Sequence, residues 1–422
     1  MAQVFQGASD DFRNAMKIKY GPGLRNAILN ANVVWAEVSR KEVEAHGLEV
    51  QWSIHTRRSS GTGMAAELGT LPTADRQRYI KPRVSLAYSY HVMSVSGPAM
   101  HLSKGKESAF ASAMEEEIQG SEKDIMFDRA RQTFGSVKFG NGAYHTGVMA
   151  VVNGDPGTGT TLTLDDGGVA LDESIMRHFF VGMKLDIVNP ADGTVRAGSP
   201  VTIDAVNVSA RTLTTAAAMN AAIGDNDFVC RTGNYNIEID GLRALLSAQQ
   251  PDGANDYDYA TGDVSANPNW IAAQAGSTTT GISEVLLEQA GELVETDGDG
   301  SSADDKLFVC EQSQRRKLAS VLQAQKRYDG KQMTLTSGWK GLELSRGTLV
   351  ADRLCPTTYI FGIHRPEIAR LVGLDFQWDE DDGGMFVRGA TDSIEARFKA
   401  YDQLAALNRN SHVQVRVQAP SF

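Results

Sequence analysis

The sequence predicts an α+β fold organised around one long helix, with a small all-β module inserted in the chain. Three observations support this class. Residues 104–135 carry apolar side chains at a helical period, and the acidic side chains between them fall on another face. Residues 49–95 alternate polar and apolar side chains on either side of a glycine-rich tip, which predicts a long hairpin. Residues 147–233 change to a composition rich in Val, Thr, Asp and Gly, typical of short strands and tight turns.

Length and composition limit the kinds of protein that the chain can be. Its 422 residues allow two or three domains with a sizeable core. No run of about 18 apolar residues occurs, so we expect no membrane span, and residues 1–20 lack the apolar segment of a secretory signal. The three cysteines, Cys230, Cys310 and Cys355, are isolated from one another, which favours reduced core thiols over a zinc site or a disulfide framework. The net charge of −11 argues against direct binding of nucleic acid, because phosphate contacts need clustered Lys and Arg.

The long helix is expected to behave as a strut. Phe110, Met114, Ile118 and Ile125 draw one apolar stripe, and Gly135 supplies the left-handed stop expected just past the end. A helix over 104–135 would be roughly 45 Å long, which fits poorly inside a compact enzyme. Its acidic side is made of Glu107, Glu115, Glu116, Glu117, Glu122, Asp124 and Asp128.

The predicted hairpin has strands at 49–58 and 79–95, joined by the tip 59–73. An isolated hairpin is only marginally stable in water, so we expect something outside it to support it. Its charge is strongly basic, with Glu67 and Asp75 as the only acids between residues 57 and 83. The bases of this stretch are Arg57, Arg58, Arg76, Arg78, Lys81 and Arg83.

The inserted module is predicted to hold short strands and to form a small barrel. The strands are expected at 147–152, 160–164, 183–188, 201–208 and 228–231. Because the two ends of an inserted module must lie close together, such a module normally projects outward. We expect it to serve contacts between assembled units or surface decoration. The alternative, glycan binding, has little support, since Phe179, Phe180 and Phe228 lack the spacing of a stacking platform.

The rest of the chain predicts mixed α/β structure. Helices are expected at 282–294 and 313–328, with strands at 307–310 and between 342 and 362. Three final strands, at 385–387, 394–401 and 413–417, are expected to return beside the long helix. Residues 1–46 mix aromatic and polar side chains around a break at Gly21-Pro22-Gly23, typical either of an extended arm or of an irregular lead-in packed on the chain's own core.

No constellation of residues predicts catalysis, a cofactor or a metal site. The segment 154–161 has the glycine spacing of a phosphate-binding loop, but Thr160 stands where the lysine is needed, which favours a turn. The segment 297–301 resembles the start of a calcium loop but lacks the required glycine and the bidentate glutamate. The acidic run 379–382 is typical of an exposed turn, and the histidines are scattered.

Several motifs together resemble the major capsid proteins of tailed bacteriophages, over nearly the whole chain apart from the inserted module. These motifs are DRARQTFG at 128–135, RVSLAYSY at 83–90, VSGPA at 95–99, IDGL at 239–242, DQL at 402–404 and NRN at 408–410. The resemblance implies the tailed-phage capsid fold with its usual parts. In this chain they would be an N-terminal arm at 1–46, an extended loop at 47–87, a peripheral domain with its spine helix at 88–146, the inserted β domain at 147–233, an axial domain at 234–374 and return strands at 375–422.

The resemblance also implies a function and partners. The chain would be a structural subunit, not an enzyme, that assembles with its own copies into pentamers and hexamers of an icosahedral head. The head would enclose double-stranded DNA without sequence-specific binding, which an acidic wall permits, and would be made in the host cytoplasm as part of the virion. A separate scaffolding protein, a portal and a decoration protein are the other expected partners. The nearest alternative is the shell protein of a bacterial nanocompartment, and the second is a carbohydrate-active or glycan-binding protein.

Charge suggests where two copies meet. The basic hairpin is predicted to dock on the acidic helix of a neighbouring copy, so that electrostatics help to set the register between subunits. The alternative is that both are ordinary solvated surfaces. The contact residues proposed from the sequence are Arg57, Arg58, Arg76, Arg78, Lys81 and Arg83 on the hairpin, and Glu115, Glu116, Glu122 and Asp128 on the helix.

Overall fold

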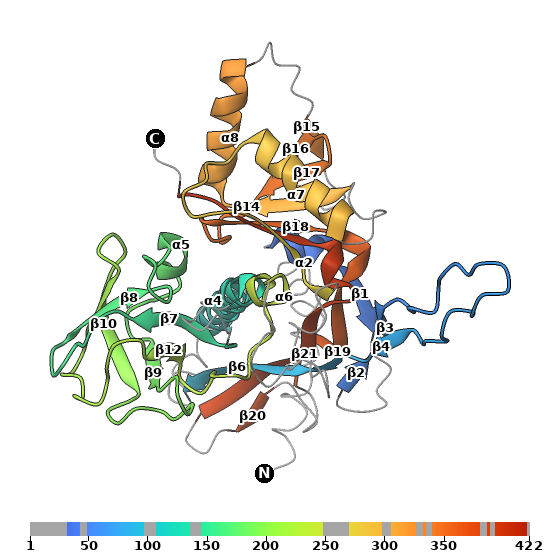
Figure 1. Ribbon diagram of the computed structural model, residues 1–422. Coiled ribbons are helices and arrows are strands. Elements are labelled where there is room, and N and C mark those ends of the chain that lie inside the picture. Colours follow the sequence, from blue (N-terminus) through green and yellow to red (C-terminus); the bar gives the residue numbers. More distant parts are fainter. Residues whose placement is uncertain are drawn as a thin grey trace.

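The computed structural model confirms the α+β class and arranges three parts around one helix (Figure 1). A barrel lies on one side of the helix, a sheet carrying two helices lies above it, and a ribbon projects on the side opposite the barrel. The structure describes residues 32–42, 49–96, 107–135, 145–247, 270–297, 305–325, 332–334, 340–379, 386–388 and 393–419.

The central helix is α4 (Glu107–Phe134), close to the predicted range of 104–135. Its 28 residues give a length of about 42 Å. It ends at Gly135, whose φ of +88° is left-handed, as predicted. A second reason for glycine here is tight packing, because a Cβ on Gly241 would lie 2.0 Å from the Cα of Gly135.

A sheet of long strands packs beside α4. The strand β21 (Ser393–Ala406) pairs on one side with β6 (Ala87–Ser96) along ten residues, and on the other with β19 (Ile368–Trp378) and β20 (Phe386–Arg388). Ile118 of α4 is buried in one cluster with side chains of these strands, including Met93 and Phe398. The predicted return of strands 385–387 and 394–401 beside the helix is therefore confirmed. The strand β19 crosses residues 374 and 375 without a break, so the chain leaves the axial part earlier than the predicted boundary.

The last part of the predicted N-terminal arm belongs to the core of its own chain. Helix α2 (Val33–Glu37) buries Val33, Val34 and Trp35, and Asn32 caps its first turn. The strand β1 (Ser39–Glu42) then pairs in parallel with β19. For residues 32–42 the alternative interpretation, a lead-in packed on the chain's own body, is the correct one. The rest of the predicted arm lies outside the described residues.

The axial part is a seven-stranded mixed sheet covered on one face by helices α7 (Glu284–Asp297) and α8 (Gln312–Gln325). Its other face packs on α2, on the end of α4 and on α6 (Leu242–Leu245). The predicted strands and helices of this region are confirmed, but the final strand of the chain lies within this sheet and not beside α4. In spatial order the strands are β13 (Ala273–Gly276), β22 (Val413–Arg416), β18 (Tyr359–Ile363), β14 (Lys306–Cys310), β17 (Gly347–Ala351), β16 (Lys340–Leu344) and β15 (Gln332–Thr334).

The inserted module is a closed barrel of six strands with a core of its own. Five of its strands lie where the sequence predicted them, and β11, at Thr212–Thr215, was missed. The segment 154–161 is the turn between β7 and β8, as expected, and not a phosphate loop before a helix. The strands in spatial order are β10 (Val201–Asn207), β11, β8 (Thr161–Asp165), β7 (Val148–Val152), β12 (Phe228–Arg231) and β9 (Lys184–Val188).

The three cysteines are small core residues, as predicted. Cys230, Cys310 and Cys355 are all buried and free. Burial raises the pKa of each thiol above its ordinary value, so these thiols stay protonated and unreactive.

Candidate functional site: the ribbon, the long helix and the groove beside the barrel

The predicted hairpin is a projecting ribbon, defined here as residues 54–80. At its base β2 (Glu49–Gln51) pairs with β5 (Arg83–Ser85), and farther out β3 (Ile54–Arg57) pairs with β4 (Arg78–Ile80). The tip between these strands, residues 58–77, contains no strand and extends away from the body (Figure 1).

One acid organises the neck of the tip. Asp75 accepts hydrogen bonds from the hydroxyl and backbone N–H of Ser60 at 2.7 and 2.9 Å and from Arg57 Nη2 at 2.6 Å. The hydrogen bonds from Ser60, followed by those from the Arg76 backbone and from Arg57, hold the pKa of Asp75 well below its usual range. Arg57 is therefore neutralised within the ribbon itself, and the remaining exposed bases carry its positive charge.

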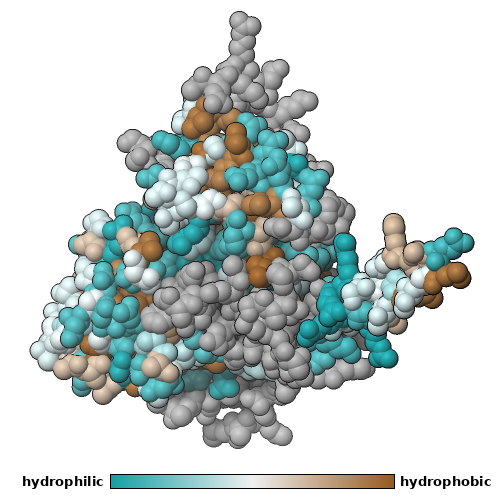
Figure 2. Space-filling view, in the orientation of Figure 1, coloured by the Kyte–Doolittle hydropathy of each residue, from teal (hydrophilic) through white to brown (hydrophobic). Residues whose placement is uncertain are grey.

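Apolar side chains stand at the far end of the ribbon without cover. Met64 and Leu68 are fully exposed and Leu71 is largely exposed, which Figure 2 shows as brown at the end of the projection. Leu68 has a left-handed φ of +63°, next to a turn in which the N–H of Gly69 donates to the carbonyl of Ala66 at 2.8 Å. A left-handed backbone at a leucine costs of order 1–3 kcal/mol, and such strain clusters at sites with a function.

The structure places some of the predicted contact residues and leaves others outside its description. Arg58, Arg76, Arg78 and Lys81 are exposed along the ribbon. The side chain of Arg83 lies outside the described part, although its backbone is in β5. The same holds for three acids of α4, whose backbone positions are described and whose side chains are not: Glu115, Glu116 and Glu122.

Asp128 is engaged within its own chain. It accepts hydrogen bonds from Arg131 Nε at 3.0 Å and Gln132 Nε2 at 2.8 Å, and it lies 3.7 Å from a guanidinium nitrogen of Arg231. Burial opposes ionisation, but the charges of Arg131 and Arg231 outweigh it and lower the pKa of Asp128. The proposal that Asp128 receives a neighbour's hairpin is therefore withdrawn, because its charge is already compensated.

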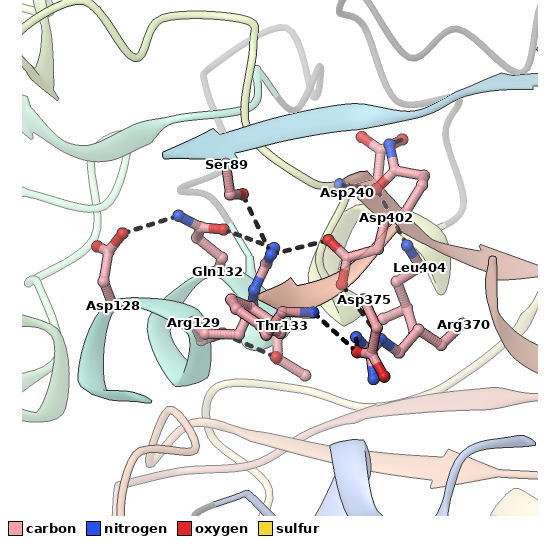
Figure 3. Close-up of polar contacts among 12 residues, drawn as sticks. Ser89, Asp128, Arg129, Gln132, Thr133, Asp240, Arg370, Asp375, Asp402 and Leu404 are labelled. Atoms are coloured by element: carbon pink, nitrogen blue, oxygen red, sulfur yellow. Dashed lines mark hydrogen bonds and ion pairs between the residues drawn. The ribbon is translucent and has the colours of Figure 1, made fainter. Parts of the chain in front are cut away.

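A buried ion network ties α4 to the sheet (Figure 3). Arg129 Nη2 donates to Asp402 Oδ1 at 2.8 Å, and Arg370 Nε donates to Asp402 Oδ2 at 3.1 Å. Arg370 also donates to Asp375 at 2.8 Å, and Arg129 reaches Ser89 of β6 at 3.1 Å. These contacts connect one turn of the helix to β21, β19 and β6, so the helix cannot slide on the sheet without breaking them.

Buried polar contacts also fix the barrel to the body. Arg243 of α6 donates to Asp166, which follows β8, at 2.8 Å and to the hydroxyl of Tyr359 in β18 at 3.1 Å. Asp172 of the barrel accepts from both the backbone and the hydroxyl of Thr357. The inserted module therefore has a fixed seat and is not attached by its two connecting segments alone.

A groove of about 330 Å³ lies where the barrel, α4 and β6 meet. Exposed apolar side chains line it from three parts of the chain: Tyr90 from β6, Phe180 from the barrel, and Ile237 from the segment after the barrel. Asp124 of α4 is an exposed acid on its wall. Sequence analysis missed this groove, because its walls come from segments that have no contact predicted by spacing.

A buried histidine also lines the groove. His178 packs against Phe127 with ring centroids 4.7 Å apart, and its Nδ1 has no hydrogen-bond partner. Burial, followed by the charge of Arg131, lowers the pKa of His178 to about 3, so its ring is neutral at pH 7.

Within the described residues, no three His, Cys, Asp or Glu side chains are grouped so as to hold a metal ion. No helix in the described part of the chain is both long enough and apolar enough to cross a membrane. The calcium-like segment 297–301 and the acidic run 379–382 fall mostly outside the described residues.

No protein-family model matches the chain, and no curated protein matches it. Among solved structures, the chain is similar to components of capsids and related particles. A chain of the cyanophage A-1(L) capsid asymmetric unit has 10% identity and a TM-score of 0.45, over 92% of this chain and 93% of that one. The SrpI encapsulin of Synechococcus elongatus has 8% identity and a TM-score of 0.44, over 93% and 90%. The virus-like particle of Pyrococcus furiosus has 9% identity and a TM-score of 0.41, over 94% and 99%.

Proposed function

We propose that this chain is the shell subunit of a tailed-phage head, which assembles with its own copies into pentamers and hexamers around double-stranded DNA. The observation that carries the proposal is the projecting ribbon with its uncovered apolar end. Met64, Leu68 and Leu71 gain nothing from this position in an isolated chain, since water surrounds them. Full burial of such a side chain is worth about 1.5–3 kcal/mol, which a neighbouring copy would supply.

The ribbon lies to one side of the body and the long helix runs across it, so a contact between copies would be heterologous. Heterologous contacts form closed rings or shells when the rotation between subunits closes. The buried network of Arg129, Asp402 and Arg370 suits this role, because a shell needs each subunit to hold its contact surfaces at a constant angle.

Electrostatics would help to set the register. The ribbon keeps exposed bases after Arg57 has been neutralised by Asp75, and α4 keeps Asp124 exposed on the groove wall. Complementary charges of this kind affect partner choice and association rate more than affinity.

The first test is microscopy of the purified protein in negative stain. Closed shells or rings are expected, and nucleic acid inside particles from the natural host would separate a phage head from a compartment that encloses protein. A chain that stays a stable monomer at high concentration would contradict the proposal.

The second test reverses two ribbon charges. We expect Arg58→Glu with Arg76→Glu to lower particle yield and to change its dependence on salt, because exposed bases would then repel the acidic partner. Arg57 is left intact, since its pair with Asp75 shapes the ribbon. The matched control reverses two exposed bases of the barrel, Arg177 and Lys184, and should leave the yield unchanged. Equal yields for both double variants would refute the electrostatic contact.

A further inference from the structure

The groove between the barrel, α4 and β6 has no role in the fold, yet it is apolar and lies at the surface. Tyr90 is 61% exposed, Phe180 55% and Ile237 56%, although each is a large apolar or aromatic side chain. A soluble protein rarely leaves such side chains grouped around a hollow unless a partner covers them.

One wall of the groove exists only because the module is inserted directly after α4. Phe180 and Met183 belong to the barrel, and Ile237 to the segment that leads from the barrel to α6. The contacts of Arg231 and Glu238 with α4 hold this wall in place, since Arg131 donates to Glu238 at 2.6 Å. The groove is therefore a built feature of this chain.

The size of the groove limits what can fill it. About 330 Å³ is near the lower limit of ordinary ligand pockets, which suits a few side chains of a narrow loop rather than a flat protein face. The buried Nδ1 of His178 offers one unpartnered polar atom on its wall, and Asp124 offers a negative charge.

The end of the ribbon has matching properties. It presents Leu68 on a strained turn, with Met64 and Leu71 beside it in the sequence and exposed bases at its neck. Apolar side chains would meet the aromatic walls, and the bases would meet Asp124. The ribbon and the barrel lie on opposite sides of the molecule in Figure 1, so a chain cannot fill its own groove with its own ribbon.

We propose that the groove completed by the inserted barrel receives the ribbon tip, residues 64–71, of a second copy of this chain. This inference rests on the proposed shell function and deepens it. It assigns the receiving site to the groove, whereas the charge pattern of the sequence had assigned it to the acidic face of the helix. It also gives the barrel a role within the assembly contact.

The test is a disulfide between copies in the assembled full-length protein. Leu68→Cys with Phe180→Cys should form a cross-linked ladder when copper phenanthroline is added, and the three native cysteines are buried and will not compete. The matched control is Leu68→Cys with Val195→Cys, since Val195 is 54% exposed on the barrel but does not line the groove. The groove pair should cross-link about tenfold more than the control pair, because a disulfide needs Cα atoms within about 7 Å.

The outcomes separate this inference from the proposed function. If the unmodified chain remains a monomer, the shell function fails and the inference fails with it. If particles form but the groove pair cross-links no more than the control pair, the inference alone is overturned. A second variant, Leu68→Ser, changes only an exposed side chain and should raise the concentration needed for assembly about tenfold. An unchanged concentration would also count against the docking of the ribbon tip.

Discussion

The buried carboxylate of Asp402 is the residue whose change tests the structure most directly. It is fully buried and accepts hydrogen bonds from Arg129 at 2.8 Å and Arg370 at 3.1 Å. Asp402→Asn keeps the shape of the side chain and removes its charge. Arg370 would keep Asp375, but Arg129 would be left with the uncharged partners Ser89 and Gln132.

The size of the effect follows from this difference. Removing one partner of a buried ion pair costs about 3–5 kcal/mol, because the other charge stays buried without compensation. We expect the lower end of this range, about 3 kcal/mol, since the neutral amide still accepts one hydrogen bond and Arg370 keeps its second acid.

Urea unfolding of the unassembled subunit, followed by tryptophan fluorescence, measures this loss. Trp35 and Trp378 lie in the core cluster beside the network and report on it. Asp124→Asn is the control, since Asp124 is an exposed acid of the same helix and its change should stay within about 0.5 kcal/mol. A loss below about 1 kcal/mol for Asp402→Asn would show that the network is not what holds α4 on the sheet.

Two further changes test the packing and the titration of the core. Gly241→Ala should destabilise the subunit by about 3 kcal/mol or more, because its Cβ would lie 2.0 Å from Gly135, whereas Gly120→Ala in the middle of α4 meets nothing within 4 Å and should stabilise by about 0.5–1 kcal/mol. Thermal unfolding compares the two, and equal effects would contradict the close approach of α4 and α6. Burial lowers the pKa of Lys306 from 10.5 to about 7, so the unfolded chain binds one more proton than the folded chain between these values. Stability should therefore rise with pH from about 7 to 10.5, by at most about 1.4 kcal/mol per pH unit from this group, and Lys306→Met should flatten the rise in urea unfolding.

Periodic patterns were enough to place most elements. The stripe through Ile118 and the stop at Gly135 located α4 within three residues at its start and one at its end. Five of the six barrel strands followed from alternation and turn residues. The strand at 212–215 was missed because four residues of Thr and Leu are too few to show a period.

The sequence by itself determined the helices, the ribbon and the closed set of strands, because these depend on side chains a few residues apart. Only the tertiary structure decided which charges were already paired. Asp128 is compensated by Arg231, and Arg129 by Asp402, a residue 273 positions away. The groove likewise joins β6, α4 and the barrel, which are brought together by the burial of apolar surface and not by any pattern along the chain. The surface proposed for assembly was therefore visible in the sequence on the ribbon side and hidden on the receiving side.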